Sequence, residues 1–131
     1  MPDVARSFVC AFGRHDRDAY FERFSHDASF VFHTVAAALP TREAYEQLWS
    51  RWESELGFRV LSCKSRYPTV QLFGDTAVFR PRVRTTIQVL GGESRLDERE
   101  TIVFHRGSDG RWLAVHEHLS AMHATNGSPA P

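Results

Sequence analysis

Two histidines near the C-terminal end, His116 and His118, are the residues whose type and spacing most directly suggest chemistry. They lie in a strand-like run, and alternate side chains of a β-strand point to the same side. The imidazole side also carries Trp112, Ala114 and Ser120, and the opposite side carries Leu113, Val115, Glu117 and Leu119. An imidazole titrates near neutral pH and can accept or donate a proton there. Alternation alone leaves open which side faces the interior.

His33, in an earlier strand-like run, is a third candidate acid or base. Two histidines at i and i+2 on a strand could instead chelate a metal ion, with His33 or a carboxylate as third ligand. The sequence leaves this alternative open, although we expect neither a metal nor an organic cofactor.

Arg99 and Thr101 share one side of the run that precedes the histidine strand. The guanidinium of Arg99 could bind a carboxylate or stabilise a developing oxyanion. It could equally pair on the surface with one of the neighbouring acids, Asp97, Glu98 and Glu100. The hydroxyls of Thr101 and Ser120 could orient a polar group of a substrate.

Three arginines, Arg80, Arg82 and Arg84, alternate along another strand-like run, with apolar residues and Thr85 in the other phase. The ordinary interpretation is a solvated face whose arginines pair with Asp97 and Glu98 on the next strand. The alternative is a patch that binds an anion.

The composition is that of one globular domain of 131 residues, with 42% hydrophobic and 24% charged residues. Lys+Arg and Asp+Glu both number 16, so no basic excess suggests a nucleic acid or a membrane as partner. Neither a signal peptide nor a membrane-spanning segment is recognisable. We therefore expect a cytoplasmic protein whose two cysteines, Cys10 and Cys63, are buried and reduced, with a single disulfide as the alternative.

The first third of the chain predicts three helices and one strand. Asp3, Asp16 and Thr41 are placed to cap the helices, and Gly13 and Gly57 to end the first and third. Between the second and third helices, residues 28–35 are a β-branched and aromatic run typical of a strand.

From Phe58 onward, glycine-rich turns separate four long strand-like runs, which predicts an antiparallel meander. Pro81 inside one run predicts an edge, a bulge or a bend, because proline cannot donate to the ladder. The expected organisation is an α+β domain over residues 1–123 with a disordered tail over 124–131. Its cone-shaped, curved antiparallel sheet would resemble a barrel and pack on the three N-terminal helices.

Several segments resemble the SnoaL-like proteins of the nuclear transport factor 2 and ketosteroid isomerase-like superfamily. The run from Gly110 to Ser120 is similar to their closing strand, residues 99–103 to the strand before it, and residues 74–78 to the middle hairpin. The resemblance covers about residues 3–122. It implies the cone fold, a pocket at the open end, and a homodimer with the outer face of the sheet as its contact surface. Such proteins include enzymes and non-catalytic modules, so the fold does not decide the activity.

The resemblance also implies that the side carrying Trp112 and the histidines faces the pocket. We therefore expect His118, His33 and Arg99 to be catalytic. The expected substrate-binding residues are His116, Thr101, Ser120, Tyr67, Trp49, Trp52 and Trp112.

The expected function is binding of a small apolar carbonyl or hydroxyl compound, with cofactor-free isomerase, cyclase, dehydratase or hydrolase chemistry. On this orientation no carboxylate of the last two strands faces inward, which disfavours the carboxylate-based mechanism usual in ketosteroid isomerase-like enzymes. The alternatives are a non-catalytic binding or oligomerisation module and, with less similarity, an iota-type carbonic anhydrase.

Overall fold

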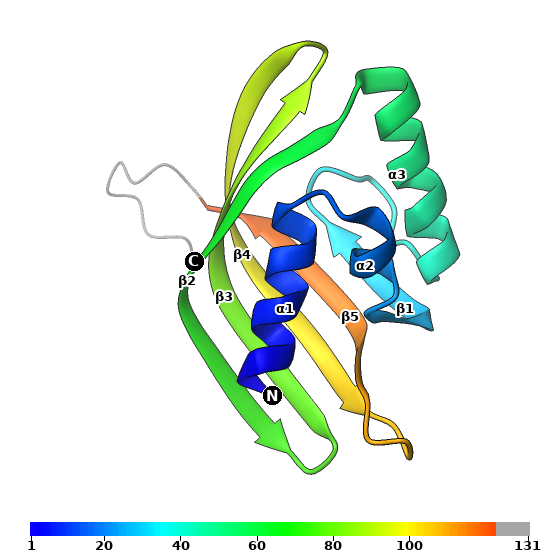
Figure 1. Cartoon of the computed structure of the whole chain (residues 1–131), viewed down its shortest axis with the longest axis vertical. Coiled ribbons are helices and arrows are strands. Elements are labelled where there is room, and N and C mark those ends of the chain that lie inside the picture. The colour runs from blue at the N-terminus through cyan, green and yellow to red at the C-terminus, as the bar shows by residue number, and fades with distance from the viewer. Residues whose placement is uncertain (123–131) are drawn as a thin grey trace.

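The computed structural model describes residues 1–122, in which three helices flank a five-stranded sheet (Figure 1). The predicted tail over residues 124–131 lies outside the described residues. The elements are α1 (Pro2–Gly13), α2 (Arg17–Phe21), β1 (Phe24–Phe32), α3 (Arg42–Leu56), β2 (Arg59–Phe73), β3 (Thr76–Val89), β4 (Gly92–Arg106) and β5 (Trp112–Ala121).

The predicted caps hold for two of the helices. Asp16 accepts a hydrogen bond from the Ala19 N–H at the start of α2, and Thr41 accepts one from the Ala44 N–H at the start of α3. Gly57 ends α3 in the left-handed conformation, with φ of 62°. Asp3 does not cap α1, because that helix already begins at Pro2 and leaves Asp3 in its first turn.

The first strand lies earlier in the chain than the predicted residues 28–35. It begins at Phe24, which pairs with Ala114 of β5, and ends at Phe32. Beyond that point the chain turns back, and Leu39 forms a bridge with Phe30. The hydrophobic run therefore continues past the end of the strand, which is why composition placed its end too late.

The α+β architecture is confirmed: a curved, unclosed sheet has the order β1-β5-β4-β3-β2, and its concave side faces the helices (Figure 1). The strands from β2 to β5 form an antiparallel meander, as expected. The sheet is mixed, because β1 lies parallel to β5.

A cluster of buried aromatic rings joins the helices to the concave side of the sheet. Trp49 of α3 is fully buried and packs against Tyr20 and Phe21 of α2, while Phe8 of α1 packs against Phe104 of β4. Burying each such side chain contributes roughly 1.5–3 kcal/mol. This core holds α3 at one end of the cone.

Pro81 is accommodated as predicted, by a bulge in the neighbouring strand. The β2–β3 register shifts between Arg66 and Thr69, so that two residues of β2, Tyr67 and Pro68, lie opposite Pro81 and β2 has one extra residue. Tyr67 has φ of 50° and is 74% exposed. The bulge bends β2 where Pro81 offers no N–H.

The two cysteines do not form a disulfide, and the expectation that both are buried is wrong for Cys10, which is exposed on α1. Cys63 is half-buried. No helix within residues 1–122 is long and apolar enough to cross a bilayer.

Candidate functional site

A bulge in β5 decides which side chains face the interior. Ala114 pairs with Phe104, whereas the next paired residue, His116, pairs with Val103, so Val115 is an extra residue. Strand alternation therefore breaks at this point, and Ala114 shares the concave side with Glu117 rather than with His116. The prediction that His116 and His118 project into the pocket is wrong for this reason.

On its concave side the sheet encloses, together with α3, a cavity of about 260 Å³. An engineered apolar cavity of about 150 Å³ holds benzene, so this one has room for a somewhat larger molecule. Its apolar wall consists of Phe12, Phe32, Trp52, Leu56, Phe58, Val83, Ile87, Val89, Leu96 and Leu119. Its polar groups come from Tyr20, Thr34, Tyr45, Cys63, Thr85, Glu98, Glu100 and Glu117.

Three glutamates, Glu98 and Glu100 of β4 and Glu117 of β5, line this cavity and are at most 9% exposed. Burial raises the pKa of Glu100 well above its ordinary value, and the neighbouring Glu117 raises it further. Burial also raises the pKa of Glu117, although hydrogen bonds from Glu100 and Tyr20 oppose that shift. The arrangement therefore favours a neutral Glu100 whose carboxyl proton is donated to Glu117.

Two buried tyrosines extend the carboxyl pair into a hydrogen-bonded chain. The Tyr20 hydroxyl lies 3.2 Å from Oε1 of Glu117 and 3.1 Å from the Tyr45 hydroxyl. Since a hydroxyl donates one hydrogen, Tyr20 donates to Glu117 and accepts from Tyr45. Burial is the largest cause that raises the pKa of both tyrosines, so they stay protonated.

Glu98 forms a hydrogen bond with His33, the residue that follows the end of β1. Its Oε2 lies 2.6 Å from Nε2 of His33, and the two side chains are 7% and 29% exposed respectively. His33 is therefore the one predicted catalytic residue that contacts the wall of the cavity, through a carboxylate that the sequence interpretation had placed outside.

Cys63 also lines the cavity, but its thiol is not poised as a nucleophile. Burial raises its pKa to about 11, and the Thr85 hydroxyl contacts its sulfur at 3.6 Å. The neutral thiol is a poor nucleophile.

The three predicted tryptophans have separate positions. Trp52 lines the cavity, as expected. Trp49 is buried beneath the cavity wall and does not line it. Trp112 packs partly against the core at the other end of β5, where the Arg106 guanidinium lies 5.4 Å from its ring centre.

The remaining predicted residues meet on the convex side of the sheet. Tyr67, Arg99, Thr101, His118 and Ser120 line a shallow groove there, together with Arg80 and Arg82. His116 lies on the same side, with Nδ1 at 2.9 Å from the Ser29 hydroxyl. Among residues 1–122, no group of three or more His, Cys, Asp or Glu side chains has an arrangement that could hold a metal ion.

The sequence did contain a signal for the inward glutamates. On β4, Glu98 and Glu100 stand in phase with Leu96, Ile102 and Phe104, all of which face the concave side. Carboxylates in phase with a strand's apolar residues are carried into the core with them. The sequence interpretation did not follow this signal, because it took the histidine side of the last strand to face inward and therefore placed these glutamates outside.

Comparison with solved structures places this fold among known ones. An NTF2-like protein of unknown function in nutrient uptake from Rhodospirillum rubrum matches with a TM-score of 0.79 and 18% identity, over 93% of this chain and 98% of its own. A ketosteroid isomerase-like protein from Erwinia carotovora atroseptica matches with a TM-score of 0.76 and 17% identity, over 94% of each chain. An NTF2-like protein from Cytophaga hutchinsonii has a TM-score of 0.75 and 15% identity, over 92% of this chain and 94% of its own. At these identities the likeness concerns the fold alone.

The search of curated proteins gave no match. The family model of the SnoaL-like domain, by contrast, matches residues 3–124, nearly the whole length of the sequence. This chain belongs to the SnoaL-like domain family.

Proposed function

We propose that the protein binds a small, neutral, largely apolar carbonyl compound in the cavity and moves a proton on it without a cofactor. The observation that supports this most directly is the presence of three buried glutamates, Glu98, Glu100 and Glu117, in a cavity with otherwise mainly apolar and aromatic walls. Burying carboxyl groups costs free energy, and perturbed carboxyls in a concave site are typical of acid–base catalysis.

The roles follow from the different surroundings of the carboxyls. Glu98, hydrogen-bonded to His33, is the proposed general base that takes a proton from the carbon next to the carbonyl. Glu100, neutral through burial and its contact with Glu117, is the proposed donor to the carbonyl oxygen as negative charge develops there. Glu98 and Glu100 lie two residues apart on one side of β4, roughly 6.8 Å between Cα atoms. A proton removed by Glu98 can return to another carbon of the same molecule, which gives an isomerase-type reaction.

The walls restrict the substrate class. The Phe, Trp and Leu side chains favour a ring or a compact alkyl skeleton, and the cavity volume limits it to a molecule of about one to two rings. A carboxylate or phosphate would be repelled by the glutamates, so the proposed substrate is uncharged.

Proton exchange in D₂O tests the proposal directly. β-Tetralone and cyclohexenone would be incubated with the protein, and deuterium incorporation followed by NMR. We expect exchange above the buffer rate, with a decrease of roughly 10²–10⁴-fold in Glu98→Gln. Glu93→Gln, an exposed glutamate on the same strand, is the matched control and should exchange at the wild-type rate.

The outcomes separate catalysis from binding. Exchange in Glu98→Gln equal to that of the wild-type protein would refute the role of Glu98. Saturable binding of the ketones without any exchange would refute the catalytic proposal and favour a non-catalytic binding protein.

A further inference from the structure

An unusual alignment of arginines crosses the convex side of the sheet. Arg66 of β2 pairs directly with Arg82 of β3, and Arg82 pairs directly with Arg99 of β4. Ser120 of β5 continues the row beside Arg99. Directly paired residues of adjacent strands project to the same side, with Cα atoms roughly 4.5–5.5 Å apart. Three guanidinium groups therefore extend from one cross-strand row.

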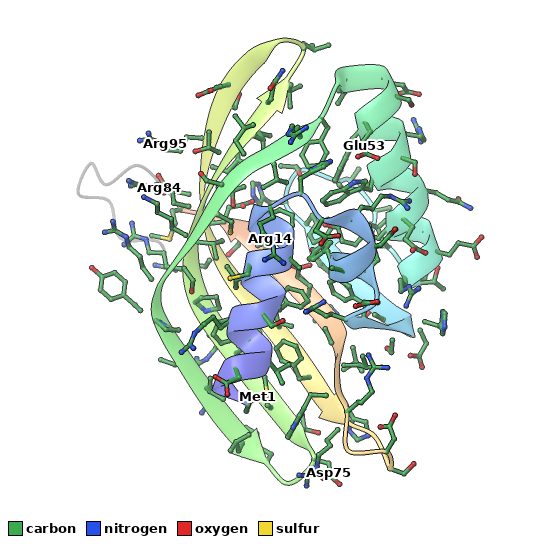
Figure 2. The ribbon with its side chains drawn as sticks, in the orientation of Figure 1. Met1, Arg14, Glu53, Asp75, Arg84 and Arg95 are labelled. Atoms are coloured by element: carbon green, nitrogen blue, oxygen red, sulfur yellow. The ribbon has the colours of Figure 1, made fainter. Side chains whose placement is uncertain are left out.

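Within the part of the chain that the structure describes, no carboxylate forms an ion pair with this row, although the pKa of Asp97 in the next row is lowered by its hydrogen bond with Arg84 and, less strongly, by Arg82. No ion pair found in residues 1–122 involves Arg66, Arg82 or Arg99. In the next row, by contrast, Nε of Arg84 lies 2.9 Å from Oδ1 of Asp97, so that arginine has a carboxylate that neutralises its charge. Arg84 and Arg95 project from the side of the sheet away from α1 (Figure 2). Residues 123–131 contain no Asp or Glu.

Like charges directly opposite each other destabilise a sheet, so three in a row call for a counter-charge. A groove of about 500 Å³ lies over this part of the sheet, and Arg80, Arg82 and Arg99 line it. Thr101, Ser120 and His118 line it as well. Glu100 also borders the groove, but it lies in phase with the residues that face the cavity on the opposite side of the sheet. Fork-shaped guanidinium donors flanked by hydroxyls match the several acceptor oxygens of a phosphate group.

We propose that this groove is a second binding site, separate from the cavity, for a phosphate or phosphate-monoester dianion held by Arg82 and Arg99. Arg66 flanks it from β2 and Arg80 from β3, two residues before Arg82, and the hydroxyls donate the remaining hydrogen bonds. The site is independent of the acid–base chemistry, because its side chains project from the opposite side of the same strands. A monovalent anion would leave most of the row's charge uncompensated, which is why a dianion is the preferred class.

A phosphate titration tests this site. Wild-type protein would be titrated at pH 7.5 with inorganic phosphate and with phenyl phosphate, at constant ionic strength adjusted with sodium chloride. For both ligands we expect a saturable binding isotherm in calorimetry and a rise in the melting temperature of the protein. A lower dissociation constant for phenyl phosphate than for inorganic phosphate would show that the phenyl group also contacts the groove. Arg82→Gln and Arg99→Gln should each raise the dissociation constant for phosphate by roughly tenfold or more.

Arg51→Gln is the matched control, since it removes the same charge from an exposed position on α3 that pairs with Glu55. It should bind phosphate as the wild-type protein does. Removing one arginine from the row should also raise the melting temperature in phosphate-free, low-salt buffer, a result that a merely misfolded variant would not give.

Three results would overturn the proposal. The first is a response to phosphate no larger than that to chloride at equal ionic strength. The second is unchanged phosphate affinity in Arg82→Gln and Arg99→Gln. The third combines two measurements: the wild-type protein binds no phosphate, and light scattering shows that these variants differ from it in molar mass. That result would assign the arginine row to contact between two copies of this chain.

Discussion

Replacing Glu100 by glutamine should make the protein more stable at neutral pH and should flatten the pH dependence of its stability. Glu100 is buried beside Glu117, and both have a pKa raised above the ordinary value near 4.5. Below the pKa of the unfolded chain, the Glu100 carboxyl is protonated in the folded and the unfolded state alike, so its titration does not change the free energy of unfolding. As the pH rises through that value, the unfolded chain releases a proton that the folded chain retains, so stability falls with increasing pH.

The magnitude follows from proton linkage. One proton retained by the folded state lowers the free energy of unfolding by up to about 1.4 kcal/mol per pH unit. Between pH 5 and pH 7, a fully retained proton would therefore cost roughly 2.7 kcal/mol at most. Glutamine has nearly the same shape, remains neutral, and can still donate to Glu117 through its NH₂ group. Glu100→Gln should thus resemble the wild-type protein at pH 5 and exceed its stability at pH 7.

Urea denaturation at pH 5, 6, 7 and 8 provides the measurement, with m-values compared to confirm that the same unfolding transition is observed. Glu93→Gln, which alters an exposed glutamate of the same strand, should keep the wild-type slope. A slope in Glu100→Gln equal to that of the wild-type protein would show that the Glu100 carboxyl does not retain its proton on folding. The assignment of Glu100 as the neutral partner would then be wrong.

Three further substitutions test the packing and hydrogen bonds that hold the site. Trp49→Ala should lower the free energy of unfolding by about 3–5 kcal/mol, because the indole is fully buried at the centre of the aromatic cluster; a loss below 1 kcal/mol in urea denaturation would contradict that position. Tyr20→Phe should cost about 1–3 kcal/mol through the lost donor to Glu117, and an unchanged denaturation midpoint would argue against the hydrogen-bonded chain. His15→Ala should destabilise by about 1–3 kcal/mol, because Nδ1 accepts the Val60 N–H at 2.9 Å and would leave that donor unpaired. Fast hydrogen exchange at the Val60 amide in His15→Ala, followed by NMR, would support this contact, and retained protection would contradict it.

Local patterns in the sequence predicted most of the architecture. The caps at Asp16 and Thr41, the stop at Gly57 and the glycine-rich turns act over a few residues, so their effect can be read without knowing the rest of the chain. The bulge opposite Pro81 was predictable for the same reason, because a missing N–H must be accommodated wherever the strand lies. Of Trp49 and Trp52, both expected to bind substrate, only Trp52 lines the cavity, and the helical pattern they share did not distinguish them.

The composition of the candidate site depended on tertiary structure. The one extra residue at Val115 reverses the direction of every side chain after it, and nothing in the type of that residue marks it as a bulge. The bulge is defined by its pairing with β4, a contact between strands. Unbroken alternation along β5, with the orientation that the family resemblance implied, therefore placed the histidines inside and Glu117 outside. The glutamates and tyrosines of the cavity come from α2, α3, β4 and β5. The raised pKa values of Tyr20, Tyr45, Glu100 and Glu117 arise chiefly from their burial together. The sequence by itself determined the elements and their order, because those follow from short-range preferences; the register between strands decided which chemistry faces the cavity and which faces the outer groove.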